Sequence, residues 1–526
     1  MWAEPKLCIR TKDPGLEKLP LVIDVEEVKD EDRLPIWRKI CFAIGGAPYQ
    51  MTNTVINFFL SIFLLEVAQI PPLYVSVIVF SGKAWDAITD PVIGILISRT
   101  NTRFGKLRPW ILFSTPFGCA TYFFMWYVPH VSDGGKLGYY FVFYCLFQGF
   151  LTCLHVPYTS MTMYITGSQK ERDSATAYRM VSEAIGVLLA SVVQGQLINK
   201  YRIAGDCKDV KATASPEQLE NQEMSYIYGS AVMIGIYLFC SLTVFFGTRE
   251  KQVGIVTDDN EDFCSGLKLV MGSKSYVRLS FAFLFISLAI AVVQGNLALF
   301  TTHAIHLGDY FSTFMVVLLA TSILSIPIWQ KILLRFGKKS TYAVGIILFI
   351  PTLLSQLYIT DNIYVYYAIL VLAGFSVAVS LLLPWSMLPD VLDEFMLETG
   401  QRKDAIFYSF YVFFNKLAAG LALGISQVVL AIGGYQTGEC RQPESVGLAL
   451  RLLIVPGPVI FCLAALIFLW MYPINEDRRK QIRSLIAEKK KKMSRQKKDD
   501  NSPPPPDEVF LKSASYDTID EFSTEC

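Results

Sequence analysis

Two aspartates inside an apolar segment are the residues best placed to do chemistry. Asp86 and Asp90 stand four residues apart, so a helix puts both carboxylates on one face, one turn from each other. Two close carboxylates repel, and a bound cation or a shared proton relieves that repulsion. We therefore predict a cation site at this pair, with Thr89 and Gln50 as further oxygen ligands. The alternative is a structural pair in which Lys83 neutralises one of the acids.

A lysine in a second apolar segment is suited to meet an anion. Counted from the ends of their segments, Lys416 and Asp86 both lie about twelve or thirteen residues deep, near mid-depth at ~1.5 Å per helical residue. An unpaired charge there costs ~2.5–3.5 kcal/mol, so it is rare without a partner or a role. Lys416 could hold a substrate phosphate or carboxylate. It could instead pair with the acids in one state of a cycle, or form a constant salt bridge to Asp86.

Other polar residues share these apolar segments. Arg179 and Glu183 are four residues apart, and a structural ion pair on one helix is the favoured interpretation. Neutral polar side chains at similar depth would support the site or hydrogen-bond between helices: Gln148, Gln294 and Asn296.

The elements that must position these residues are long apolar helices. Nine runs of 21 or more residues contain no Asp, Glu, Lys or Arg, enough to cross ~30 Å of hydrocarbon as a helix. Continuous apolarity favours helices, because barrel strands alternate polar and apolar residues. With three charged but apolar segments, we predict twelve spans, near 41–65, 73–98, 109–132, 137–169, 175–198, 224–248, 279–308, 310–330, 340–360, 362–389, 404–432 and 452–475.

Composition excludes several other classes of protein. Of 526 residues, 52% are hydrophobic and only 18% charged, too little charge to cover a soluble protein of this length. Lys plus Arg (47) nearly equals Asp plus Glu (46), so no basic face for nucleic acid is indicated. The 11 cysteines show no metal-ligand spacing. Without a sizeable aqueous domain to hold a catalytic constellation, we expect no enzyme.

A repeated tetrapeptide indicates an internal duplication. Arg103-Phe-Gly-Lys106 follows the second span and Arg335-Phe-Gly-Lys338 follows the eighth. The same residues at the same topological place, six spans apart, favour two six-helix units related as parallel repeats. Basic residues gather in the even-numbered loops, which places those loops and both termini in the cytoplasm. We expect Arg103, Lys106, Arg335 and Lys338 to act in cytoplasmic gating.

The duplication gives a domain plan. We expect a cytoplasmic segment at 1–38, an N-terminal bundle at 39–248, a cytoplasmic linker at 249–275 and a C-terminal bundle at 276–472. A basic, largely disordered cytoplasmic tail would occupy 473–526, either lying on anionic lipid or simply solubilising the chain end.

Five motifs of the sequence are distinctive when taken together. They are Trp85-Asp-Ala-Ile-Thr-Asp-Pro91, Arg103-Phe-Gly-Lys-Leu-Arg-Pro-Trp110, Glu171-Arg-Asp-Ser-Ala-Thr-Ala-Tyr-Arg179, Leu383-Pro-Trp-Ser-Met-Leu-Pro-Asp390 and Phe410-Tyr-Val-Phe-Phe-Asn-Lys416. In these motifs the sequence resembles the melibiose-permease-like cation symporters of the major facilitator superfamily, and within them the lysophospholipid-transporting members. The resemblance implies an all-α membrane protein with the major facilitator fold, twelve transmembrane helices in two pseudo-symmetric six-helix bundles.

The resemblance also implies an activity. By the family's motif, Asp86 and Asp90 would hold a co-transported Na⁺ and Lys416 would meet the headgroup phosphate. The expected function is sodium-dependent symport, by alternating access, of lysophosphatidylcholine carrying long-chain fatty acids, including docosahexaenoate. Alternatives are a sphingosine-1-phosphate exporter of the sister branch, where the resemblance implies that the first acid is absent, a cation-coupled sugar symporter, and a passive lipid scramblase.

The remaining expectations concern surroundings. Cys207 and Cys440 fall in equivalent loops after spans five and eleven, so they form either an outer disulfide, which the resemblance supports, or two unpaired thiols. We expect a plasma-membrane protein, with the endoplasmic reticulum as a further location left open. Its partners would be the lysophospholipid substrate and membrane lipids, with no nucleic acid, and it would function as a monomer.

Overall fold

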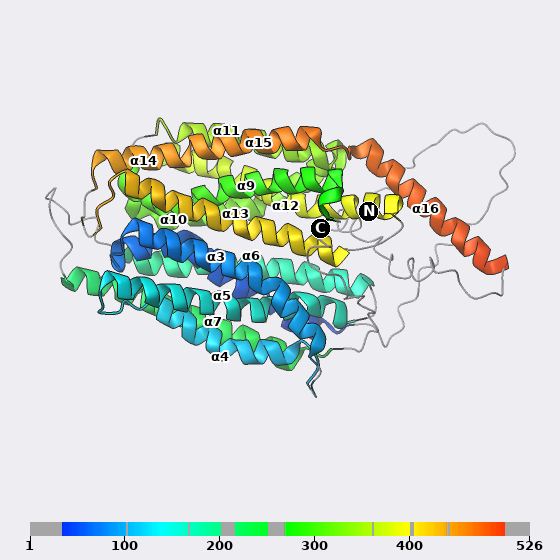
Figure 1. Cartoon of the computed structure of the whole chain (residues 1–526), viewed down its shortest axis with the longest axis horizontal. Helices are drawn as coiled ribbons and strands as arrows, with labels where there is room; N and C mark the ends of the chain where they lie inside the picture. The colour runs from blue at the N-terminus through cyan, green and yellow to red at the C-terminus, as the bar shows by residue number, and fades with distance from the viewer. Residues whose placement is uncertain are drawn as a thin grey trace, which may run out of the picture.

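The structure is a bundle of long helices. This computed structural model describes residues 34–100, 102, 104–166, 169–200, 216–250, 268, 270–359, 362–399, 404–437, 439 and 442–499. Within these residues the backbone is almost entirely helical, and Thr102 and Gly105 form an isolated β-bridge. The helices run roughly parallel to the long axis of the molecule (Figure 1).

The first half of the chain forms six spans. Its first span is interrupted at Gly45-Gly46, where a Cβ on Gly46 would lie 2.7 Å from Cγ of Glu183, so these glycines permit close packing of two helices. The elements are α1 (Ile36–Ile44), α2 (Ala47–Ile62) and the π-helical turn η2 (Phe63–Val67) in span one, then α3 (Pro72–Arg99), α4 (Arg108–Met125), α5 (Asp133–Tyr164), α6 (Gln169–Lys200) and α7 (Pro216–Gly247).

The second half repeats this order and adds one helix. Its elements are α9 (Lys274–Leu299) with the π-helical turn η3 (Phe300–Ala304), η4 (Gly308–Tyr310), α10 (Phe311–Phe336), α11 (Lys338–Ser355), α12 (Ile363–Thr399), α13 (Asp404–Ile432), α14 (Glu444–Ile454) with α15 (Pro456–Met471), and α16 (Glu476–Asp499). In Figure 1, α16 projects from one end of the bundle, which we call the α16 end; the other is the distal end.

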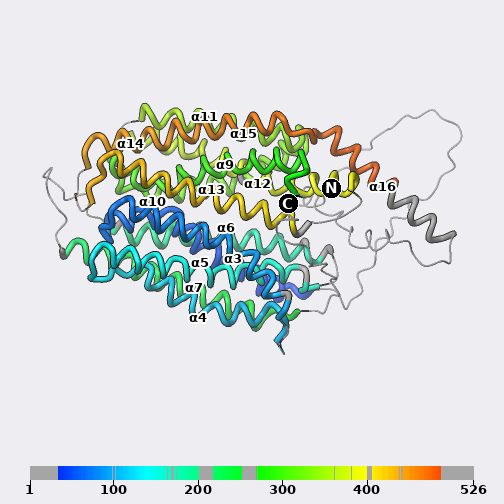
Figure 2. Tube along the Cα trace, viewed as in Figure 1, coloured from blue at the N-terminus to red at the C-terminus, as the bar shows by residue number. Residues whose placement is uncertain are grey.

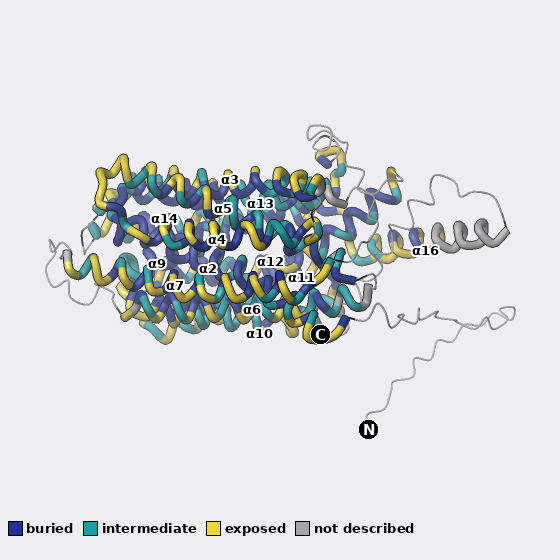
Figure 3. The backbone as a smooth tube through the Cα atoms, turned by 90° about the horizontal axis from the view of Figure 1, so that it is seen from below, coloured by how far each residue is buried: buried dark blue, intermediate teal, exposed yellow. Residues whose placement is uncertain are grey.

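These elements correspond to the twelve predicted spans. Among the described residues, nine continuous helical stretches are long and apolar enough to cross a membrane. The other three spans are α4 and α11, each 18 residues long, and α3, which carries Lys83, Asp86 and Asp90 within it. Figure 3 shows buried residues toward the inside of the bundle and many exposed ones outside. Large apolar side chains lie on that outer surface, as a lipid-facing surface requires.

The two halves share backbone details that support the duplication. Gly105 and Gly337, in the repeated tetrapeptides, both have positive φ, +108° and +80°, a conformation that glycine adopts without steric cost. Gln69 and His306, just after the two π-helical turns, are the only described non-glycine residues with positive φ, at 54° and 55°. Features so rare recur at equivalent places because the two halves have the same architecture.

The halves meet along three helix pairs. Helix α3 packs against α13, α6 against α10, and α2 against α9; the α3–α13 contact is visible where the blue and yellow traces run side by side in Figure 2. These pairs place the predicted site residues of α3 and α13 at the junction.

The tail differs from the sequence-based expectation in its first part. Residues up to Asp499 form the helix α16 where we expected a largely disordered tail. Ile482 and Ile486, one helical turn apart, are buried, which stabilises a helix that is otherwise strongly polar. Residues 500–526 and, within the predicted linker at 249–275, residues 251–267 and 269 lie outside the described residues.

Candidate substrate and cation site

The two aspartates lie together at the junction of the halves. Asp86 and Asp90 are one turn apart on α3 and bind the same ammonium group, which confirms the predicted common face. Pro91 follows them inside the helix and cannot donate a hydrogen bond to the carbonyl of Ala87. That leaves a backbone acceptor of the same turn without its usual helical donor.

Lys416 of α13 bridges both acids. Its Nζ lies 2.9 Å from Oδ1 of Asp86 and 2.6 Å from Oδ2 of Asp90. The side chains of Asp86 and Lys416 are only 7% and 14% exposed, so this is a buried, charge-assisted contact between the halves. Among the roles predicted for Lys416, pairing with the two acids is therefore the one present in this structure.

Asp86 accepts a hydrogen bond from a hydroxyl group, whereas one carboxylate oxygen of Asp90 has no described hydrogen-bond donor. Thr152 of α5 donates to Oδ1 of Asp86 over 3.1 Å, and its oxygen lies 3.3 Å from that of Thr89. In contrast, Oδ1 of Asp90 is buried and accepts no hydrogen bond in the described part of the chain. Two carboxylates, one of which has an oxygen without a described hydrogen bond, and two hydroxyls form a donor set of the type that hard cations prefer.

Lys83, the residue of the structural alternative, makes its described hydrogen bond to a neutral side chain rather than to either acid. Its Nζ donates to Oδ1 of Asn53, 3.1 Å away on α2. A Cβ on Gly420 of α13 would lie 2.8 Å from Cβ of Lys83, so a glycine allows the two halves to approach closely here.

A second charged pair lies on α6. Nε of Arg179 is 2.6 Å from Oε1 of Glu183, which is the ion pair that their spacing indicated. The guanidinium also lies over the Tyr158 ring. Close to this pair, Tyr49 of α2 and His155 of α5 stack with ring centroids 3.6 Å apart. Tyr49, His155 and Thr152 were not predicted as site residues, because a single neutral side chain carries no spacing signal.

The remaining predicted polar residues are not brought to the carboxylates by any described contact. Gln148 is buried and reaches the hydroxyl of Tyr144 at 3.4 Å. Asn296 is also buried and donates to the carbonyl of Val292. Gln50 of α2 and Gln294 of α9 are partly buried.

The repeated loops lie at the α16 end. Lys106 contributes its backbone N–H to a contact with Glu250, whereas Lys338 buries its side chain against Asp390. Arg335 is exposed, with its guanidinium near the Phe336 ring. Arg103, Cys207 and Cys440 lie outside the described residues.

Solved structures identify the class of fold. The chain is similar to the nucleoside transporter NupG, with a TM-score of 0.57 at 13% identity over 84% of this chain and 99% of that one. It is also similar to the E. coli fucose:proton symporter FucP, with a TM-score of 0.52 at 13% identity over 84% of this chain and 99% of that one. The fold is that of the major facilitator transporters.

The family follows from the sequence comparisons. Residues 41–476 match the family described as MFS/sugar transport protein, and the chain belongs to it. A relative from Xenopus tropicalis, sodium-dependent lysophosphatidylcholine symporter 1, is 44% identical over 85% of this chain and 89% of its own. The human protein of that name is 40% identical over 88% and 90%. A sphingosine-1-phosphate transporter of Xenopus tropicalis is 41% identical over 86% and 90%.

Proposed function

We propose that this chain is a sodium-dependent symporter of lysophosphatidylcholine, with Asp86 and Asp90 binding Na⁺ and Lys416 meeting the headgroup phosphate. The observation that carries the proposal is the shared ammonium: one lysine holds two acids, Asp86 buried and Asp90 partly buried, across the junction of the halves. The three groups together are one positive charge short of neutrality, and a single Na⁺ supplies that charge.

Exchange at this site gives a coupling mechanism. Charges taken out of water need a partner, so Lys416 leaves the acids only when another cation compensates them and an anion receives the ammonium. Na⁺ at the aspartates and a phosphate at Lys416 meet both conditions together. Each ligand then raises the affinity of the other by the same factor.

The described contacts between the halves also fit an alternating-access cycle. On the distal side of the acids, Oγ of Ser76 donates to the carbonyl of Gly424, and a Cβ on Gly195 would lie 2.6 Å from Cβ of Ser312. With both termini in the cytoplasm, as we propose, the structure is closed toward the outside. The reverse rocking would open it there.

The lipid substrate is supported by the relatives and by the character of the spans. The names of the two symporters described above include lysophosphatidylcholine. The helices are rich in apolar side chains and have few hydroxyl and amide groups at mid-depth, which suits an acyl chain better than a sugar. We place the protein in the plasma membrane and keep the bundle boundaries at 39–248 and 276–472 as part of the proposal.

The second candidate is export of sphingosine-1-phosphate. It is favoured by the 41% identity to a sphingosine-1-phosphate transporter. The phosphate of sphingosine-1-phosphate could also bind Lys416. The two functions differ in dependence on Na⁺: loss of uptake on removal of Na⁺ supports the symporter, whereas Na⁺-independent efflux supports the exporter.

Uptake of radiolabelled lysophosphatidylcholine, with and without Na⁺, tests the proposal. We expect Asp90→Asn and Lys416→Ala to lower Na⁺-dependent uptake about tenfold or more at equal surface expression, since each breaks the coupling. Asp477→Asn and Lys480→Ala, at exposed positions of α16, are the matched controls. If Asp90→Asn takes up lipid with unchanged Na⁺ dependence, the assignment of the cation site is wrong.

A further inference from the structure

A histidine–carboxylate hydrogen bond joins the two halves at the distal end, away from the proposed substrate site. Nε2 of His303 lies 2.8 Å from Oε1 of Glu66, and the two side chains are only 8% and 18% exposed. Glu66 is in η2 at the end of the first span, and His303 is in η3 at the end of the seventh. The contact therefore links the first helix of one bundle to the first helix of the other.

The two positions are equivalent under the duplication. Each is the fourth residue of a five-residue π-helical turn, Phe63–Val67 or Phe300–Ala304, and each turn is followed by a residue with positive φ. Symmetry-related positions meet each other only close to the axis that relates the halves. An isolated π-helical turn is uncommon and often marks a functional position.

Each turn is anchored within its own half by a cation. Nζ of Lys136 donates to the carbonyl of Ala68, directly after η2. The guanidinium of Arg451 donates to the carbonyls of Ala304, Gln356, Leu357 and Ile359. These bonds tie each turn to its own bundle, so a force that separates the bundles acts on the contact between Glu66 and His303.

Neutral contacts between the halves also lie at this end of the described chain. They include the hydrogen bond of Ser76 to Gly424, the close approach of Gly195 to Ser312, and the edge contact of the Phe59 and Phe311 rings at 5.4 Å. Such contacts fill space with little directional preference, whereas a charge-assisted hydrogen bond requires one geometry. The ring of Tyr435 packs edge-on against His303, which supports the imidazole in that geometry.

We propose that Glu66 and His303 form a latch that holds the distal end closed and opens once in each transport cycle. The proposal rests on the alternating-access function proposed above. Removing the latch raises the population of the distally open state, which we expect to increase about tenfold. Because that equilibrium is a property of the protein alone, it can be measured without Na⁺ or lipid.

A cysteine reporter measures the opening directly. Ser312→Cys places a thiol at a buried position that faces Gly195 of the other half, where a water-soluble maleimide reacts only after the distal end opens. In purified protein in lipid nanodiscs, Glu66→Met and His303→Phe should each raise its labelling rate about tenfold. His303→Phe keeps a ring against Tyr435. Protein without the reporter gives the background from native cysteines.

A swap separates a latch from general damage. Because the two positions are symmetry-equivalent, Glu66→His combined with His303→Glu should restore slow labelling. The control is Glu444→Met, at an exposed site of the same end, which should leave the slow labelling rate of the reporter protein unchanged. Unchanged labelling in both single variants, or a swap as fast as the singles, would overturn the proposal.

A cross-link provides a second measurement that tolerates poor stability of the single variants. Glu66→Cys with His303→Cys, bridged by a short bifunctional thiol reagent, should stop lipid uptake until a reductant releases the bridge. Continued uptake with the two halves bridged would also overturn the latch. Slow labelling restored by the swap together with Na⁺-independent uptake would instead reject the proposed function and leave the latch standing.

Discussion

The repeated tetrapeptide is held in two different ways in the two halves. In the first half, the carboxylate of Glu250 accepts three backbone hydrogen bonds, from Lys106, Leu107 and Arg108, at 2.7–2.9 Å. It thus caps the first turn of α4, where helical N–H groups lack partners and a negative charge is favourable. The side chain of Lys106 plays no part in this cap.

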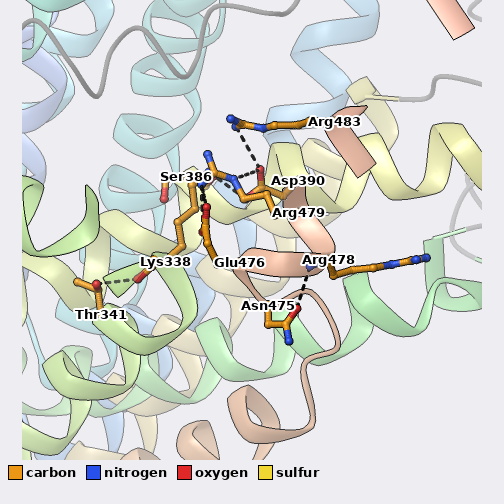
Figure 4. A network of polar contacts seen from close by, with 10 residues as sticks. Lys338, Thr341, Ser386, Asp390, Asn475, Glu476, Arg478, Arg479 and Arg483 are labelled. Atoms are coloured by element: carbon orange, nitrogen blue, oxygen red, sulfur yellow. Dashed lines mark hydrogen bonds and ion pairs between the residues drawn. The ribbon is translucent and has the colours of Figure 1, made fainter. Parts of the chain in front are cut away.

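In the second half, the side chain of the tetrapeptide's lysine, Lys338, makes the stabilising contacts. Nζ of Lys338 lies 2.9 Å from Oδ2 of Asp390 and donates to the carbonyl of Ser386 at 2.7 Å. Arg479 of α16 reaches the other oxygen of Asp390 at 3.1 Å, and Arg483 lies 4.0 Å away. Figure 4 shows these cations converging on Asp390 from α11 and α16.

One element of the arrangement is nevertheless common to both halves. An acid that follows the sixth span of each bundle lies against the positive-φ glycine: a Cβ on Gly105 would be 2.5 Å from Oε1 of Glu250, and one on Gly337 would be 3.0 Å from Oε2 of Glu476. The difference arises because the second half also has α16 to bind. Duplication therefore preserved the turn, while the lysine of one copy took on the task of docking an additional helix.

The largest effect should come from removing the centre of the second-half network. Asp390→Asn removes the carboxylate that pairs with the buried Lys338 and leaves Arg479 with Glu476 as its other acid. Breaking a buried pair in this way costs about 3 kcal/mol or more. We expect a clear fall in the unfolding temperature of the detergent-purified protein. Asp477→Asn, at an exposed position of α16, should leave that temperature unchanged. Equal stability of the two variants would show that the network contributes little.

Removing the first-half cap should have a smaller effect. Glu250→Ala deprives three backbone N–H groups of their acceptor, but nearby water can replace part of it, so we expect a loss of about 1–2 kcal/mol. The matched variant is Glu476→Ala in the second half, whose described hydrogen bonds are to Arg479 alone. If Glu476→Ala is as destabilising as Glu250→Ala in thermal unfolding, the two loops are held more alike than their contacts indicate.

The sequence was informative wherever interacting residues lie on one helix or one long run. The spacing of Asp86 and Asp90 predicts their common face, and the spacing of Arg179 and Glu183 predicts their ion pair, because both follow from helical periodicity. Apolar runs predict the spans since the hydrocarbon thickness sets their length. Depth counting also placed Lys416 near Asp86, although it left open whether the two would touch.

Contacts between distant segments could not be predicted in this way. Glu66 and His303 are 237 residues apart, and Lys106 and Glu250 are 144 apart, so no periodicity connects them. Helix α16 was missed for a different reason: its composition is that of a solvated chain, and its packing against α12 is a contact between distant segments. The internal duplication offers one way to find such contacts in the sequence. It makes the ends of spans one and seven equivalent, so Glu66 and His303 can be recognised as corresponding polar residues.

Two adjacent arginines of α16 give the finest test of the difference between the halves. Arg478 pairs with Glu394 at 3.4 Å, but its side chain is 47% exposed, whereas Arg479 is 13% exposed and faces Asp390. Exposed pairs are screened by water and contribute about 0–1 kcal/mol, so Arg478→Ala should change the unfolding temperature only slightly. Arg479→Ala removes a buried partner of Asp390 and should lower that temperature measurably. If both variants have the same unfolding temperature, the buried isoleucines and the overall charge of α16 hold it against the bundle. The network around Lys338 and Asp390 then has no specific role in docking α16.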